Sequence, residues 1–349
     1  MNRVFQGRKY SGMESGNFVQ KGAASLSVAY DGPPRDFHFL LLPKMTMLAF
    51  SAAVEPLRIA NQVTKRPLYR WYTITANGVP VQCSNGVRIT PDSGFRQLDK
   101  SDTLFVCSGV EPSEAASSLD IAWLRRLRAF GVTLGSICSG AHVLAQAGLI
   151  GRQKFTLHWE NQPAFCENFT ELTPTQNLYE IEDGLMTCGG GSAATDMMLD
   201  LIEADHGREL AVIVADMCIH SRASNREAPQ KSALSVAIGS RNQHLLNAIK
   251  LMNDQIEEPI QIEDICTELD VSRRQLERLF KKYANVSPSR FYYDLRLSRA
   301  HAYLNETNMS VTEIAAATGF NTTDHLSAQF RKKYGVSPKG FRKGWAARG

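Results

Sequence analysis

The chain has 349 residues and a formal net charge of +4, with 39 Lys and Arg against 35 Asp and Glu. This length suits two domains, with ample room for a sizeable core in the larger one. The seven cysteines are odd in number, widely spaced and free of Cys-x-x-Cys pairs, which argues against a disulfide framework and a structural zinc site and favours a reducing cytoplasm.

The positive charge is concentrated toward the C-terminus. From Arg241 onward the chain holds 17 Lys and Arg against 12 acidic residues, whereas the residues before it hold 22 against 23. A domain that binds the phosphates of DNA needs such an excess. The charge distribution therefore supports a DNA-binding role for the C-terminal part.

The first 35 residues are polar, with several Gly and Ser, and lack the apolar core of a signal peptide. We expect residues 1–35 to form a disordered tail. No segment of the chain approaches 18 uninterrupted apolar residues, so no membrane-spanning helix is expected.

Short apolar runs begin at residue 37 and alternate with helical patterns such as 49–62 and 122–130. The runs that read as buried strands are 37–42, 71–75, 103–107, 132–137 and 185–188. Strands buried on both faces and separated by helices predict an α/β domain with a flavodoxin-like, mostly parallel sheet between helices. Ligands of such sheets bind outside the carboxyl ends of the strands.

A tight strand-to-helix junction lies at residues 135–141, which read GSICSGA. The small residues permit a sharp elbow that places Cys138 between a buried strand and a helix. A helix N-terminus favours the anionic form of a thiol. We therefore expect Cys138 and Ser139 to lie in a ligand site.

A second junction, residues 188–196, reads CGGGSAATD. Backbone amides at Gly190 and Gly191 could hold a carboxylate there, although tight packing of the strand onto the helix explains such glycines equally well. Glu55, in the helix after the first strand, is either a carboxylate aimed at the elbow or a surface acid beside Arg58.

Three segments resemble the class I glutamine amidotransferase-like (PfpI-like) domain that GlxA-type regulators carry. They read FLLLP…EPLRIAN, GSICSGAHVLAQAGLIGRQKFTLHW and LYEIEDGLMTCGGGSAATDMMLDLI. The resemblance covers roughly residues 36–221 and implies a nucleophile elbow at Cys138 with Glu55 as its partnering acid. His158 and Trp159 could line the same pocket, or His158 could be structural.

Catalysis at Cys138 needs a base within hydrogen-bond reach. PfpI-type hydrolases commonly carry His directly after the Cys, where this chain has Ser139. We therefore expect a non-catalytic, ligand-sensing domain without cofactor or metal. The alternative is a cysteine-dependent amidase or amidotransferase.

Residues 222–240 are polar and short of large apolar side chains, which predicts a linker to a DNA-binding domain at 241–349. In that domain the stretches 262–291 and 311–341 repeat each other. Identical residues recur fifty positions apart: Phe280, Val286, Ser287, Pro288 and Phe291 match Phe330, Val336, Ser337, Pro338 and Phe341. Each copy has the layout of a helix-turn-helix.

In the first copy, Ser272 followed three residues later by Gln275 is a capping pattern that starts a helix. Leu276, Leu279 and Phe280 fall on one side of it. The opposite side carries the cations that a helix in a major groove would present: Arg273, Arg274, Arg278, Lys281 and Lys282. An ordinary surface helix with a solvated basic face is the alternative.

The second copy predicts a helix starting near Asn321 or Thr322. Its candidate DNA contacts are Thr322, Thr323, Asp324 and His325 at the start and Arg331 and Lys332 near the end. With cations only near its end, this helix is expected to position the protein on phosphate more than to read bases. A connecting helix over 290–305 could hold the two recognition helices in successive major grooves, about 34 Å apart.

The segment 260–342 resembles the AraC/XylS-type DNA-binding domain, through SRRQLERLFKKY…SPSRFYYDLRLSRA and GFNTTDHLSAQFRKKYGVSP. Both resemblances together imply a cytoplasmic transcription regulator, which we expect to be an activator. The expected partners are double-stranded promoter DNA, a small effector of the amino-acid or quaternary-amine class, RNA polymerase and a second copy of the chain. Two alternatives remain for the N-terminal domain. It could be an enzyme fused to the DNA-binding module, or a domain that only dimerises that module.

Overall fold

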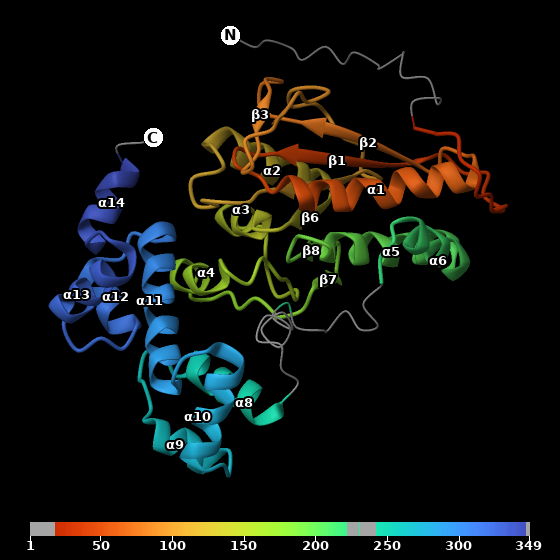
Figure 1. Ribbon diagram of the computed structural model, residues 1–349. Helices are drawn as coiled ribbons and strands as arrows, with labels where there is room; N and C mark the ends of the chain where they lie inside the picture. The colour runs from red at the N-terminus through yellow and green to blue at the C-terminus, as the bar shows by residue number, and fades with distance from the viewer. Residues whose placement is uncertain (1–17, 222–229, 231–241, 347–349) are drawn as a thin grey trace, which may run out of the picture. The chain divides into compact units, whose positions relative to one another are not determined.

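The computed structural model describes residues 18–221, 230 and 242–346 (Figure 1). The chain divides by its contacts into two compact units: Met1–Trp159 with Glu171–Pro229, and Glu160–Thr170 with Gln230–Gly349. The expected linker lies, apart from residue 230, outside the described residues. Within the described ranges, no helix is long and apolar enough to cross a membrane.

The first unit is built on a six-stranded sheet with strand order β2-β1-β5-β6-β8-β7. Its strands are β1 (Arg35–Leu41), β2 (Tyr69–Ile74), β5 (Thr103–Cys107), β6 (Thr133–Ile137), β7 (Tyr179–Glu182) and β8 (Leu185–Cys188). All neighbours pair in parallel except β7, which forms an antiparallel edge with β8. The predicted mostly parallel sheet is confirmed. A short hairpin of β3 (Val81–Gln82) and β4 (Arg88–Ile89) lies outside it.

Helices cover both faces of this sheet (Figure 1). They are α1 (Met47–Thr64), α2 (Ser118–Phe130), α3 (Gly140–Gln146), α5 (Ala193–His206) and α6 (Arg208–Met217). The alternation along β1 explains the two layers: Phe37 and Phe39 join the core that α1, α5 and α6 complete, whereas His38 on the other face bonds Asp102 at 3.2 Å. Fully burying such aromatic side chains contributes about 1.5–3 kcal/mol each.

The predicted disordered tail, residues 1–35, is wrong for residues 18–35, the last of which begins β1. The ring of Phe18 is buried and meets Trp71 edge-on at 5.0 Å, and the Leu26 amide donates to the carbonyl of Val63 at 3.0 Å. Ala24, Leu26, Val28 and Tyr30 also pack against the core that α1 helps to form. These few apolar residues are spaced among Gly and Ser, so the polar composition did not reveal them. Residues 1–17 lie outside the described part of the chain.

The second unit is all-helical in its described residues, as predicted for 241–349. It also includes residues 160–170, which the sequence had assigned to the sensor domain. Its helices are α4 (Gln162–Asn168), α8 (Gln243–Asp254), α9 (Ile262–Glu268), α10 (Arg273–Ala284), α11 (Pro288–Glu306), α12 (Val311–Ala317), α13 (Thr323–Tyr334) and α14 (Pro338–Ala346). The pairs α9–α10 and α12–α13 are the two helix-turn-helix copies. The hydroxyl of Ser272 accepts the Gln275 amide at 3.2 Å and begins α10 as the capping pattern predicts.

Helix α11 connects the hydrophobic cores of the two copies. Its Tyr292 packs in the cluster formed by α8, α9 and α10, while its Leu297 and Leu304 pack in the cluster that contains α12 and α13. The guanidinium of Arg296 also donates to the carbonyls of Thr318 and Gly319, in the turn between α12 and α13. One continuous helix therefore fixes the geometry of both copies.

This arrangement makes Leu297→Ala a severe change. Leu297 is 1% exposed, so the truncation should lower the free energy of unfolding of the second unit by about 2–5 kcal/mol. Chemical denaturation measures the loss, with Ser289→Ala, at an exposed position of the same helix, as the control. Equal stability of the two variants would contradict the shared-core role of α11.

Candidate functional site

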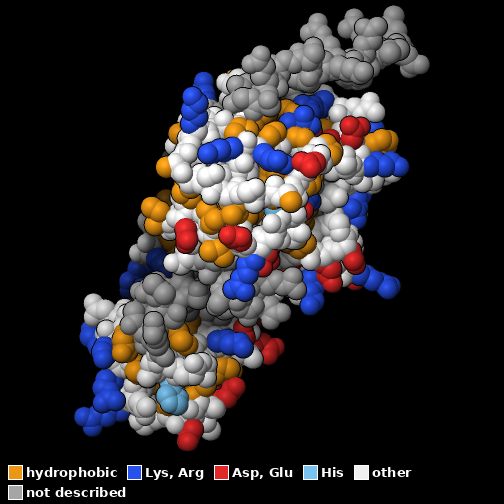
Figure 2. Space-filling model, turned by 90° about the vertical axis from the view of Figure 1, so that its right-hand side faces the viewer, with side chains coloured by type: hydrophobic (Ala, Val, Ile, Leu, Met, Phe, Trp, Pro, Cys, Tyr) orange, Lys and Arg blue, Asp and Glu red, His pale blue; other side chains and the backbone are white. Residues whose placement is uncertain are grey.

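Helix α10 has one apolar and one cationic side. Leu276, Leu279 and Phe280 are buried, while all five cations predicted to face DNA are exposed: Arg273, Arg274, Arg278, Lys281 and Lys282. Figure 2 shows Lys and Arg among Asp and Glu on the visible face of the second unit, so positive charge does not dominate that face. The local cluster on α10 is therefore the stronger basis for a DNA-contacting surface.

The first cation of α10 is held by two carboxylates. Arg273 pairs with Glu277 one turn later at 3.1 Å and with Glu263 on α9. The hydrogen bond to Glu277 is the main cause that raises the pKa of Arg273, followed by the charge of Glu263. No ion pair joins Arg274 to another described residue. Arg274 is therefore the more available of the two for a base edge.

Helix α13 differs from α10 at its start. Its N-cap Thr322 accepts the His325 amide at 3.1 Å, and the His325 ring nitrogen Nε2 lies 2.8 Å from the Tyr293 hydroxyl on α11. Thr322, Asp324 and His325 are exposed and Thr323 is half-buried. Arg331 and Lys332 are exposed in its last turn.

Arg296, which no sequence pattern singled out, supports α13 from α11. Besides its two carbonyl bonds, its guanidinium lies over the Phe320 ring at 4.5 Å. The contact joins residues far apart in the chain, so only the folded structure reveals it. It orients the turn that begins the second recognition helix.

The first unit has a sharp elbow at Cys138, where the sequence predicts one, and its backbone is strained. Cys138 lies between β6 and α3 with φ of 61°, a left-handed conformation that costs a non-glycine residue free energy. Gly190 makes room for it, since a Cβ there would lie 2.8 Å from the Cβ of Cys138. Gly140 lets the start of α3 approach β5, since a Cβ there would lie 2.1 Å from the carbonyl oxygen of Val106. The two predicted junctions therefore meet at Cys138.

Most polar groups around Cys138 form hydrogen bonds or close contacts with other residues of the first unit. The Thr46 hydroxyl lies 3.5 Å from the Cys138 sulfur, and the Ser139 hydroxyl donates to the Gly109 carbonyl at 2.6 Å. Backbone amides of Cys138 and Gly190 bond the Cys188 sulfur, but burial dominates and raises the pKa of that thiol to about 12. Cys188 therefore stays a thiol at neutral pH.

The remaining predicted ligand residues lie at different depths. The His158 amide donates to the Cys138 carbonyl at 3.3 Å, which places this backbone beside the elbow, and Trp159 is 40% exposed. Gly191 has open space where a side chain would be. Glu55 is half exposed and its carboxylate pairs with Arg58 at 2.7 Å, the arrangement of a surface acid.

One pair near this region was not predicted. Asp196, in the first turn of α5 after the glycine-rich junction, is buried and lies 3.0 Å from the ring nitrogen Nε2 of His220. An acid in the first turn of a helix was visible in the sequence, but its partner lies 24 residues away. The pair anchors residue 220, just before the chain leaves the described first unit.

His142, on α3, gives the elbow region an acid sensitivity. Burial lowers the pKa of its imidazole to about 4, from 6.5 in an unfolded chain. The folded protein keeps this group neutral, whereas the unfolded chain takes up a proton below about pH 6.5. The free energy of unfolding is therefore unaffected by this group above pH 6.5. It decreases as the pH falls from 6.5 toward 4, because the proton taken up by His142 stabilises the unfolded chain.

The test is His142→Gln, which removes the titrating group. The difference in unfolding free energy between wild type and variant should shrink by up to about 3 kcal/mol between pH 7 and pH 4. Denaturant titrations of both proteins at several pH values measure this difference. A difference that is constant across that range would contradict the assignment.

Comparisons with known proteins agree with these two units. A family model described as the DJ-1/PfpI family matches residues 53–204, and one described as a helix-turn-helix domain matches residues 265–344. The HTH-type transcriptional regulator GbdR of Pseudomonas aeruginosa is 39% identical over 311 residues, covering 89% of this chain and 85% of that protein.

Two further relatives align over similar lengths. CdhR of Pseudomonas aeruginosa is 40% identical over 304 residues, covering 87% of this chain and 90% of that protein. GlxA of Rhizobium meliloti is 34% identical over 306 residues, covering 87% and 94%. The chain therefore belongs to the family of HTH-type transcriptional regulators that join a DJ-1/PfpI domain to a C-terminal AraC-type helix-turn-helix domain.

Proposed function

We propose that this transcription regulator activates its promoters by inserting α10 and α13 into the major groove of DNA, in response to a small nitrogenous metabolite bound at the Cys138 elbow. The observation that carries the DNA part is the exposed row of cations on α10 above a buried apolar side. A helix of this kind, presented by a helix-turn-helix, fits the width of the major groove.

The two recognition helices would contact different parts of the DNA, α10 the base edges and α13 the phosphates. Arg274 at the start of α10 can donate two hydrogen bonds to a guanine, whereas Lys281 and Lys282 in its last turn suit phosphate. In α13 the exposed start offers Asp324 and His325, and cations appear only at the end. Helix α13 would therefore fix the register on the backbone, and α10 would read bases.

The elbow supports the effector part of the proposal. Cys138, Ser139, Gly190 and Gly191 surround a strained turn at the carboxyl ends of β6 and β8, where ligands of such sheets bind. The N-terminus of α5 follows directly and favours a carboxylate, while the exposed ring of Trp159 could face an ammonium group. An amino acid or a betaine-like quaternary amine combines both charges.

The runner-up is a cysteine-dependent hydrolase, which the elbow itself favours. Against it, the Ser139 hydroxyl is bound to a carbonyl and the pKa of His142 near 4 makes its imidazole a weak base. A domain that binds its effector at the elbow without hydrolysing it would still need the sharp turn at Cys138. The regulator would act in the cytoplasm, as a dimer that contacts RNA polymerase at the promoter.

Arginine substitutions test the DNA part. Arg274→Ala should weaken binding to the preferred site, selected from a random DNA pool, by about 1–3 kcal/mol and relax preference at one base. Arg273→Ala should have the smaller effect, because the guanidinium of Arg273 is already paired with Glu263 and Glu277. Lys282→Ala should weaken all sequences alike and flatten the salt dependence, because it removes a phosphate contact. Fluorescence anisotropy at several salt concentrations separates the two. Unchanged affinity and preference in both arginine variants would refute base reading by α10.

Cys138→Ser tests the sensing part. Serine keeps the shape of the elbow, so the transcriptional response in a promoter–reporter strain should persist. The wild-type protein should release no ammonia from a panel of amides and amino acids. Steady product release by wild type that disappears in Cys138→Ser would establish the enzyme instead.

A further inference from the structure

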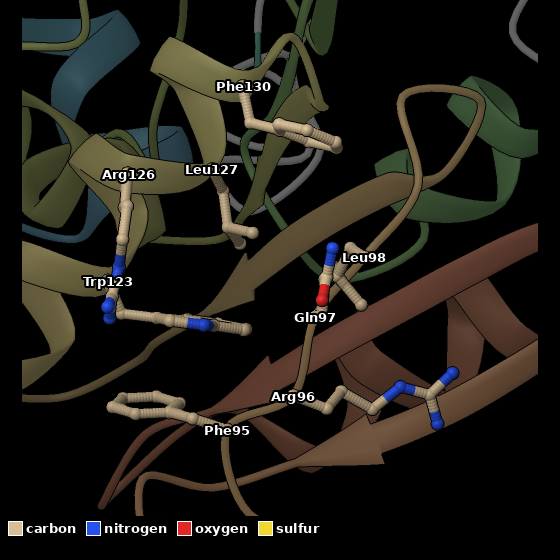
Figure 3. Close-up of a pocket in the computed structure, with 8 residues that line it drawn as sticks. All are labelled: Phe95, Arg96, Gln97, Leu98, Trp123, Arg126, Leu127 and Phe130. Atoms are coloured by element: carbon tan, nitrogen blue, oxygen red, sulfur yellow. The ribbon is translucent and has the colours of Figure 1, made fainter. Parts of the chain in front are cut away.

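A cavity of about 320 Å³ lies in the first unit, between α2 and the segment that joins β4 to β5 (Figure 3). Neither element contributes a residue to the elbow. Its eight lining residues are Phe95, Arg96, Gln97, Leu98, Trp123, Arg126, Leu127 and Phe130. The volume is at the lower end of the range for small-molecule sites, which suits a compact organic ligand.

The walls of this α2 cavity are aromatic and aliphatic. The rings of Phe95 and Trp123 stack face to face at 4.4 Å with an angle of 16° between their planes. Phe95 therefore covers one face of the indole, and Trp123, which is 4% exposed, lines the cavity with a small part of its ring. Figure 3 shows Leu127 and Phe130 on the same helix, with Leu98 and Gln97 facing them from the other segment. Phe130 is 45% exposed, so its ring offers apolar surface at the rim of the cavity.

The charged residues that line the cavity are both cations, one of which, Arg96, also interacts with the carboxylate of Asp102. Arg96 and Arg126 line it, no carboxylate does, and the ammonium of Lys100 lies 5.5 Å from the Phe130 ring. Arg96 is placed over the Tyr72 ring at 4.5 Å. A cationic ligand would therefore meet repulsion here, in contrast to the effector proposed at the elbow.

Of the two arginines that line the cavity, Arg126 is the one available to a ligand. Its neighbours on α2 both serve the fold, since Arg125 donates to the Ala147 carbonyl at 2.8 Å and Arg128 to the Gly184 carbonyl at 3.3 Å. The Arg126 side chain is exposed, and no described residue forms a hydrogen bond or ion pair with its guanidinium. A guanidinium at the rim of an apolar cavity is suited to a carboxylate.

We propose that the α2 cavity binds a small organic acid with an aromatic or branched apolar body. The body would lie against Trp123, Leu127 and Phe130, and its carboxylate would pair with Arg126. The cavity would thus be a second ligand site of the regulator, separate from the elbow and opposite in its charge preference.

Two probes of the same shape and opposite charge test this directly. Isothermal titration calorimetry of the full chain with 1-naphthylacetate should show saturable binding, at least about tenfold tighter than with 1-naphthylmethylamine. Arg126→Gln should weaken 1-naphthylacetate by about tenfold without weakening the amine. Arg152→Gln, another exposed arginine of this unit outside the cavity, should bind both probes like wild type.

Phe130→Ala provides an independent check, because it should weaken both probes by removing apolar contact. The proposal is overturned if neither probe binds, if both bind equally, or if Arg126→Gln has no effect. It is also overturned if Phe130→Ala converts a dimer to a monomer in sedimentation, since a second copy would then be the occupant. DNA takes no part in these titrations, so their failure leaves the proposed function untouched.

Discussion

The second unit depends on one helix that belongs to two hydrophobic cores. Helix α11 is 19 residues long, about 28 Å at the α-helical rise, and its two ends pack in different clusters. Because it cannot bend without opening one of them, α10 and α13 keep a fixed separation. Two recognition helices gain specificity only if their spacing matches the helical repeat of DNA. The rigidity of α11 is thus a condition for reading two grooves at once.

A comparable constraint acts at the elbow of the first unit. The left-handed Cys138 fits because Gly190 lacks a side chain where the two residues approach, and the start of α3 approaches Val106 closely because Gly140 lacks one. A strained backbone conformation persists where many surrounding contacts hold it in place, and such positions are often ligand sites. The same geometry can present a nucleophile. The Ser139 hydroxyl, however, donates its hydrogen bond to the Gly109 carbonyl, and His142 is a weak base, so the elbow is better suited to binding a ligand than to catalysis.

Sequence patterns predicted the parts of the fold that depend on local chemistry. The run 103–107 is β5 with the same bounds, and the Ser272 cap begins α10 as expected. The edge strand β7 was missed because it is short and only half-buried, and the packed residues 18–34 were missed because their few apolar side chains are dispersed. The Asp196–His220 and Arg296–Thr318 contacts join distant positions, so no local pattern could reveal them. The site residues predicted for DNA and ligand remain predictions about binding, although the exposure of the α10 cations agrees with them.

Footprinting is the most direct test of the central claim, that α11 holds two DNA-reading helices at one fixed spacing. The DNA would be the sequence that the full chain selects from a random pool, and hydroxyl-radical cleavage would report protection at single-nucleotide resolution. The account predicts two protected segments on one face of the duplex, separated by one helical turn of about 10 base pairs. A single protected segment, or two segments whose spacing varies freely among the selected sequences, would contradict it.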